Sequence, residues 1–177
     1  MNAAAPFVPE GVYQSLSSLT PRKAEALSSV ILYALRRMQT EELAQLPDVG
    51  EGLENVLYRQ ARACTDYTEF LFACKTKRYT LARLKRISMN ALLGVRKSDL
   101  SLAPYIRVLG VRKDAKHLLS QLSQSSVLPV VIDYADWTNL PAQTRRMAEI
   151  DLFASETACM AADAPAVFDY RRHLLLV

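Results

Sequence analysis

The sequence has few glycines, five in 177 residues, and contains neither a Walker A loop nor a G-x-G-x-x-G loop. These loops bind nucleotide phosphates through closely approaching backbone, so nucleotide binding by either of them is excluded. The apolar residues are mostly Ala and Leu rather than Val and Ile, which favours helices over a large β-sandwich or barrel. Half of the residues are hydrophobic and 23% are charged, the composition of an ordinary globular domain.

Cysteine and histidine are also scarce. Cys64, Cys74 and Cys159 are odd in number and have no C-x-x-C spacing, so neither a disulfide framework nor a zinc site is expected. We expect them to be small buried hydrophobic residues in a reducing compartment. The histidines, His117 and His173, lie far from each other and show no catalytic spacing, which favours surface or capping roles.

Long apolar runs are absent as well. The longest tracts, such as residues 127–132, are about a third of the roughly 18–20 residues needed to span a membrane. Residues 1–9 lack the basic and apolar regions of a secretory signal. These features predict a soluble, cytoplasmic chain. A loose acidic group is more typical of helix caps than of a metal site; it comprises Asp133, Asp136, Glu149 and Asp151.

Positive charge is concentrated in residues 75–97, which carry eight basic residues and no acidic one, although the whole chain has a net charge of only +4. Such a distribution is typical of a surface that binds a polyanion. Two alternatives stay open: a solvated basic face that binds nothing, or arginines that pair with Glu51 or Glu54 of the preceding predicted helix.

Caps and apolar periodicity predict a mainly α fold with a small parallel β-α-β element. Helices are expected from Pro21, after an N-cap at Thr20, to about residue 38, and over about 51–63, 67–74, 80–93, 113–124 and 141–160. Strands are expected over 104–110 and 128–132, and residues 169–177 end the chain in a short, extended segment. Asp48 and Asp66 are predicted N-caps, and Gly94 a C-cap. The chain reads as one domain, 1–177, with a helical basic part over about 1–97 and the β-α-β element and last helix over about 98–177.

The start of the basic segment is the predicted nucleic-acid site. Lysine and arginine neutralise phosphates, and an aromatic ring beside them can stack on an unpaired base. The candidate residues are Lys75, Lys77, Arg78, Tyr79, Arg83 and Arg86. An alternative for Tyr79 is a ring that packs on the core at the start of the helix. No catalytic residue and no metal ligand is predicted.

Several stretches together resemble the C-terminal half of the bacterial tRNA(Met) cytidine acetate ligases. They are DVGEGLEN at 48–55, KTKRYT at 75–80 followed by Arg83 and Arg86, YIRVLG at 105–110, SVLP at 126–129 and EID at 149–151. The resemblance runs from about residue 6 to residue 155. Members of this family have an N-terminal nucleotidyltransferase-like domain with an H-x-G-H ATP site, and they transfer an activated acetyl group to the wobble cytidine of elongator methionine tRNA.

The resemblance implies a tRNA-binding C-terminal domain that contacts the anticodon arm and is not catalytic alone. The chain has no H-x-G-H motif, so the resemblance also implies that ATP belongs to a missing nucleotidyltransferase-like domain and that this chain itself takes no cofactor. The alternative function is a structural module whose basic helix docks onto a catalytic domain or onto its own acidic residues, with Glu51, Glu54 and Glu69 as the nearest candidates.

Overall fold

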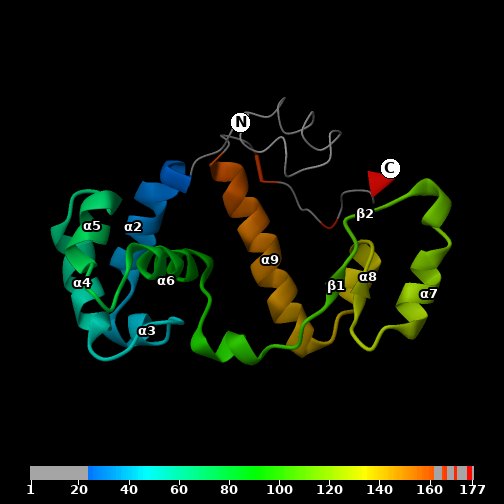
Figure 1. The fold of residues 1–177 in the computed structure, drawn as a ribbon, viewed down its shortest axis with the longest axis horizontal. Coiled ribbons are helices and arrows are strands. Elements are labelled where there is room, and N and C mark those ends of the chain that lie inside the picture. Colours follow the sequence, from blue (N-terminus) through cyan, green and yellow to red (C-terminus); the bar gives the residue numbers. More distant parts are fainter. Residues whose placement is uncertain (1–23, 162–164, 167–169, 171–174, 177) are drawn as a thin grey trace.

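The computed structural model describes residues 24–161, 165–166, 170 and 175–176. The fold is mainly α with a small amount of parallel sheet, as the sequence predicts. Figure 1 shows a group of helices on one side, the long helix α9 in the middle, and the strands with α7 and α8 on the other side. The predicted cap at Thr20 and Pro21 lies outside the described residues, as does His173.

The helical group surrounds one hydrophobic core. After a short 3₁₀ turn at Ala24–Leu27, its helices are α2 (Ser28–Arg37), α3 (Thr40–Ala44), α4 (Leu53–Ala63), α5 (Tyr67–Cys74) and α6 (Leu81–Leu93). Leu35, Leu57, Phe70 and Leu84 come from four of these helices and are fully buried together. Their helical spacing in the sequence puts each on the inward face, because side chains three and four residues apart share a face.

Two of the predicted helix caps in this group, Asp66 and Gly94, are confirmed. The Asp66 carboxylate accepts a hydrogen bond of 2.8 Å from the Glu69 backbone N–H and so begins α5. Gly94 adopts a left-handed conformation with a φ of 66° and ends α6. The short helix α3 was not predicted, because its five residues are too few to show a helical period.

Asp48 does not cap a helix, contrary to the prediction. It has a positive φ of 66°, and α4 begins only after Gly52. The pattern of an acidic residue three positions after an aspartate is shared by caps and by turns, so sequence spacing alone did not separate them. Asp48 instead lies in a loop that the basic segment holds, as described below.

After α6, the described residues form two very short parallel strand pairs and three α-helices, with 3₁₀ turns between them. The strands are β1 (Ile106–Arg107), β2 (Gly110–Val111), β3 (Val130–Val131) and β4 (Leu175–Leu176), and the helices are α7 (Leu118–Ser125), α8 (Tyr134–Thr138) and α9 (Ala142–Met160). The predicted parallel pair exists, with Ile106 opposite Val130. A second pair, β2 with β4, places Gly110 opposite Leu175; of the extended segment expected over 169–177, the structure describes only residues 170 and 175–176.

Two details of this part differ from prediction. The single strand expected over 104–110 is broken into β1 and β2, which pair with different partners. The helix expected over 113–124 begins as a 3₁₀ turn at Lys113–Ala115. Helix α7 has no buried residue, and its Leu118 is 47% exposed. A short amphipathic helix needs a partner surface to bury its apolar face, and the described residues supply only part of one.

A second, smaller core lies under the strands and contains Val131, Leu140, Ala148 and Tyr170. Helix α9 connects the two cores. Arg146 on α9 donates a hydrogen bond of 3.0 Å to the Gly94 carbonyl oxygen at the end of α6 and lies 3.5 Å from the Asp99 carboxylate. No described helix is both long and apolar enough to cross a membrane.

Candidate nucleic-acid interface

The loop between α3 and α4 has an unusual backbone. Asp48, Glu51 and Gly52 all have positive φ, at 66°, 55° and 83°. Only glycine adopts this region without cost, so Asp48 and Glu51 need contacts elsewhere that hold them there.

Three arginines of the basic segment make those contacts. Arg83 donates a hydrogen bond of 2.6 Å to the Asp48 carbonyl oxygen, and Arg86 binds the Asp48 carboxylate at 3.1 Å. Arg78 forms an ion pair with Glu51. The pairing that the sequence left open is therefore present, with Glu51 rather than Glu54 and with Asp48 in addition.

Tyr79 is part of the same arrangement and lies beneath it. Its side chain is buried among the residues of the main core, and its hydroxyl donates a hydrogen bond of 2.8 Å to the Gly50 carbonyl oxygen. The Arg83 guanidinium lies 4.8 Å from the centre of the Tyr79 ring, within range of a cation–π interaction. In this structure Tyr79 packs on the core, the alternative to a base-stacking ring.

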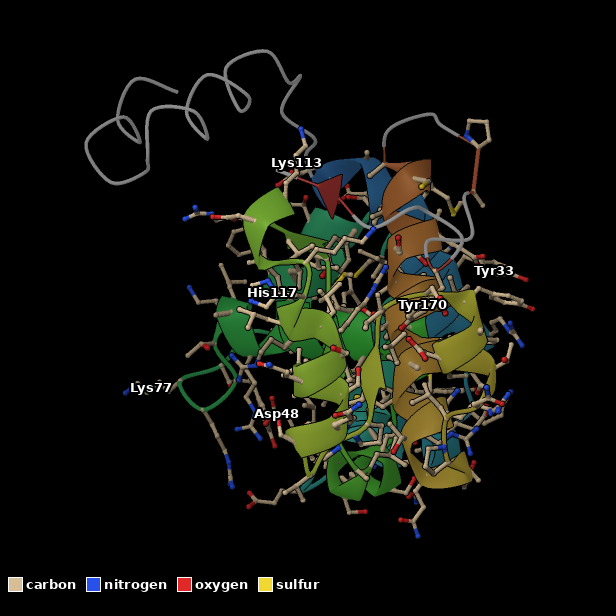
Figure 2. The ribbon with its side chains drawn as sticks, turned by 90° about the vertical axis from the view of Figure 1, so that its right-hand side faces the viewer. Tyr33, Asp48, Lys77, Lys113, His117 and Tyr170 are labelled. Carbon is tan, nitrogen blue, oxygen red and sulfur yellow. The ribbon has the colours of Figure 1, made fainter. Side chains whose placement is uncertain are left out.

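The lysines of the segment are arranged differently. Lys75 and Lys77 follow α5, Lys85 lies on α6, and all three are exposed. Within the part of the chain that the structure describes, no acidic side chain pairs with any of them. They therefore present ammonium groups to solvent beside the arginines, and Figure 2 shows Lys77 projecting from the same side of the molecule as Asp48.

The arginine pairs are exposed enough to be exchanged. The side chains of Arg78 and Glu51 are 59% and 58% exposed, and ion pairs in such surroundings are worth about 0–1 kcal/mol. A phosphate could take over part of this hydrogen bonding without a large loss of stability. The carboxylates of Asp48 and Glu51 lower the local positive charge, so the lysines supply most of the uncompensated charge.

A second polar cluster lies at the other end of the molecule. The Tyr105 hydroxyl donates to the Asp151 carboxylate at 2.9 Å and lies 2.5 Å from the Tyr170 hydroxyl, while Arg107 binds the same carboxylate at 2.9 Å. Burial raises the pKa of Tyr105 to about 12 and also raises the pKa of Tyr170. Both hydroxyls stay protonated at neutral pH, so this cluster is a set of donors around one carboxylate that fixes Tyr170 to β1 and α9.

The cysteines and the acidic group considered in the sequence analysis form neither a reactive site nor a metal site among the described residues. All three cysteines are free and buried; burial raises the pKa of Cys64 and raises that of Cys74 to about 12, which keeps both as thiols. No group of three His, Cys, Asp or Glu residues within the described ranges could hold a metal ion. Of the loose acidic group, Asp133 caps α8 as expected, by accepting from the Asp136 N–H at 3.1 Å, whereas Asp151 lies within α9 and binds Tyr105 and Arg107.

A cavity of about 440 Å³ lies among α2, α3, α6 and α9. Its lining includes Tyr33 and Arg37 from α2, Phe153 from α9, and Arg96 just after α6. Sequence reasoning counted Arg96 in the basic segment but did not group it with Tyr33, Arg37 or Phe153, because these residues come from separate elements and form no local motif.

Comparison with known proteins decides the family. A family model described as HIGH Nucleotidyl Transferase matches residues 1–171. The chain belongs to this nucleotidyltransferase family. Because the model matches nearly every residue, membership does not depend on any single motif such as H-x-G-H.

Curated relatives share the same printed name, tRNA(Met) cytidine acetate ligase. The protein from Bacillus subtilis (strain 168) is 32% identical over 147 residues, which cover 80% of this chain and 34% of that protein. The protein from Alkaliphilus metalliredigens (strain QYMF) is 28% identical over 172 residues, covering 91% of this chain and 41% of that protein. The chain thus spans well under half the length of the relatives it matches.

A solved structure confirms the fold. TmcAL from Thermotoga maritima, described as bound with alpha-thio ATP, superposes with a TM-score of 0.77 at 20% identity and covers 93% of this chain and 44% of that one. A second crystal structure of the same protein, described as apo, gives a TM-score of 0.73.

These findings correct three expectations. The chain is not a C-terminal domain whose nucleotidyltransferase part is missing, because a nucleotidyltransferase model matches residues 1–171. The prediction of a separate tRNA-binding domain that is not catalytic alone, with a missing partner domain, is wrong for the same reason. The prediction that the chain takes no cofactor is also wrong, since the family is one of nucleotidyltransferases and the structural neighbour is described with an ATP analogue. These predictions rested on a few short stretches that resemble the C-terminal half of the ligases and on the absent H-x-G-H motif, whereas the family model matches residues 1–171.

The described side chains do not fit the histidine-based ATP site that the resemblance implies. His117, the single histidine within the described ranges, is exposed, and its Nδ1 lies 3.0 Å from the Asp114 carbonyl oxygen. The loop before α4 places the carboxylates of Asp48 and Glu51 beside its glycines and lacks the pattern of the glycine-rich loops that bind nucleotide phosphates. The described residues therefore assign no catalytic step to ATP.

Proposed function

We propose that this chain acts in the acetylation of cytidine in tRNA(Met), with acetate and ATP as the other substrates. The observation that carries the proposal is the shared name of the curated relatives, tRNA(Met) cytidine acetate ligase, over as much as 92% of the chain. Membership of the nucleotidyltransferase family and the ATP analogue named for the structural neighbour support ATP as a substrate.

The basic segment is the part of the chain best suited to tRNA. Lys75, Lys77 and Lys85 offer uncompensated positive charge on one surface, next to Arg78 and Arg86. Phosphate contacts of this kind orient an RNA and steer its approach without reading its sequence. We assign this surface to the anticodon arm of elongator methionine tRNA, with the arginines exchanging carboxylate for phosphate as the RNA arrives.

Tyr79 and Arg83 have a supporting role in this proposal. They hold the 48–52 loop by hydrogen bonds to the carbonyl oxygens of Gly50 and Asp48. That loop fixes the carboxylates against which Arg78 and Arg86 are aligned. The six predicted residues thus divide into an exposed group that meets the RNA and a supporting pair, the buried Tyr79 and the half-buried Arg83, that holds the loop in place.

The binding part of the proposal is tested by a salt titration of tRNA(Met) binding, with fluorescence anisotropy as the readout. Replacing Lys75, Lys77 and Lys85 by Ala is expected to weaken binding and to lower the log–log salt slope by about 2–3. The matched control replaces Lys113 and Lys116, which are exposed lysines in the strand-containing part. An unchanged slope in the triple variant, with the fold intact by circular dichroism, would remove the basic segment from the interface.

The activity is tested by incubating the chain with radiolabelled acetate, ATP and a methionine tRNA transcript, and by measuring label in the RNA. A transcript with the wobble cytidine replaced by uridine is the negative control. Label that depends on ATP and on that cytidine supports the proposal. No label above the control, from a chain that is folded and binds the tRNA, would contradict it.

A further inference from the structure

The cavity among α2, α3, α6 and α9 combines an apolar floor with aromatic and cationic groups at its edge. Leu46 and Ala91 are buried at its base. Tyr33 and Phe153 line it from α2 and α9, and their side chains are 66% and 45% exposed. Large aromatic rings left this open beside a cavity indicate a contact surface rather than core packing.

Two arginines complete the lining. Arg37, in the last turn of α2, and Arg96, after α6, both lie at the cavity and are exposed. In the part of the chain that the structure describes, neither guanidinium has a carboxylate partner. The cavity has one acidic lining residue, Glu42, whose carboxylate already accepts the Gln39 N–H at 2.9 Å. The lining is therefore net positive.

The walls of the cavity are fixed by contacts between elements. Lys97 donates its backbone N–H to the Gln45 carbonyl oxygen at 2.8 Å and its ammonium to the Ala44 carbonyl oxygen at 2.7 Å. Arg146 ties α9 to the Gly94 carbonyl oxygen. These bonds hold the Arg96 side of the cavity against α3 and the Phe153 helix against α6, so a ligand would meet a largely preformed site.

From this geometry we propose that the cavity is a nucleotide-binding site, in which a base lies against Tyr33 and Phe153 while Arg37 and Arg96 bind its phosphate. Stacking on aromatic rings beside arginines is the chemistry that recognises an unpaired nucleotide. Arginine also suits phosphate better than lysine, because its planar guanidinium donates two parallel hydrogen bonds. The volume of about 440 Å³ is within the range of small-molecule sites.

This site is separate from the lysines and arginines at 75–86, although Arg96 comes from the end of the basic segment. Figure 2 shows Tyr33 and Lys77 on opposite sides of the molecule. The proposal deepens the proposed function, on which its choice of nucleotides rests: the same chemistry comes either from a free adenine nucleotide or from an unpaired nucleotide of the tRNA. The experiment separates these two sources.

The test measures binding to the full chain by isothermal titration calorimetry with two probes, ATP and the anticodon stem-loop of methionine tRNA. Three single variants are compared with the unmodified chain: Tyr33→Ala, Arg37→Ala and Arg96→Ala. Phe72→Ala and Arg59→Ala are the matched controls, because Phe72 is an exposed aromatic on α5 and Arg59 an exposed arginine on α4, both outside the cavity lining. Loss of one stacking contact is expected to weaken binding about tenfold.

The result identifies the source of the ligand. Weaker ATP binding by the cavity variants alone assigns the cavity to a free nucleotide; weaker stem-loop binding by them alone assigns it to the RNA. Binding of both probes that is equal in cavity variants and controls, or no binding of either probe, overturns the proposal. Stem-loop binding that depends on Lys75, Lys77 and Lys85 but not on the cavity residues would contradict the cavity proposal and leave the proposed function standing. ATP binding that depends on the cavity residues, in a chain that does not acetylate tRNA, would support the cavity proposal and contradict the proposed function.

Discussion

Arg83 and Asp48, 35 positions apart in the sequence, are joined by a hydrogen bond of 2.6 Å from the guanidinium to the backbone carbonyl oxygen. The bond joins α6 to the loop before α4. The same guanidinium also lies over the Tyr79 ring, 4.8 Å from its centre. Two stretches that read as separate motifs in the sequence therefore form one structural unit. Part of the basic segment holds a strained loop, and the other part faces solvent.

Replacing Arg83 by Ala is expected to destabilise the protein by about 1–2 kcal/mol, because it removes a charge-assisted hydrogen bond and a cation–π contact. The free energy of unfolding in urea measures this. Arg59→Ala is the control, since the Arg59 side chain is exposed and has no hydrogen-bond or ion-pair partner among the described residues. Equal stability of both variants would show that the loop does not depend on Arg83.

Replacing Gly52 by Ala is expected to cost about 1 kcal/mol of stability. The φ of Gly52 is 83°, and an added Cβ would meet no atom within 4 Å, so the cost comes from the backbone conformation alone. Gly50 offers a matched control, because its Cβ would also meet nothing and its φ is not in the positive range. A Gly50→Ala variant that loses as much stability as Gly52→Ala would contradict this explanation.

Stability is expected to fall at alkaline pH through Tyr105. Its pKa is raised from 10.0 to about 12, so the unfolded chain loses this proton first. The contribution is fully present below pH 10 and is lost as the pH rises from about 10 to about 12. Tyr170, whose pKa is also raised, acts in the same direction.

The measurement is the free energy of unfolding between pH 9 and pH 12 for the parent and for Tyr105→Phe. The variant should lose less stability over this interval, because it lacks the titrating hydroxyl. Its stability at pH 8 should be lower than that of the parent, since the hydrogen bond to Asp151 is gone. An identical pH profile would exclude Tyr105 as a source of the alkaline loss.

The three thiols are expected to react slowly with a disulfide reagent in the native state. Cys64, Cys74 and Cys159 are buried, and the raised pKa of Cys74, about 12, leaves almost no thiolate at neutral pH. Absorbance of the released thiol measures the reaction, and the same titration in denaturing urea gives the reference rate. Fast native labelling of Cys74 would show that α5 opens readily.

The elements that depend on short-range patterns were predicted well. The Asp66 cap places the start of α5, and Gly94 ends α6, because each acts on backbone groups within a few residues. Predictions were less accurate where one sequence pattern is compatible with two local structures. Asp48 has the spacing of a cap but adopts a left-handed turn, and residues 104–110 have the composition of one strand but form two.

The candidate site shows the same division. The sequence alone determined where the positive charge is, and that the protein is mainly helical, because charge and helical periodicity are properties of neighbouring residues. Only the tertiary structure decided that Arg78, Arg83 and Arg86 are engaged by the 48–52 loop while Lys75, Lys77 and Lys85 face solvent, and that Tyr33 and Phe153 meet at one cavity. Those arrangements depend on which helices pack together, and that packing is set by the whole buried core rather than by any local segment.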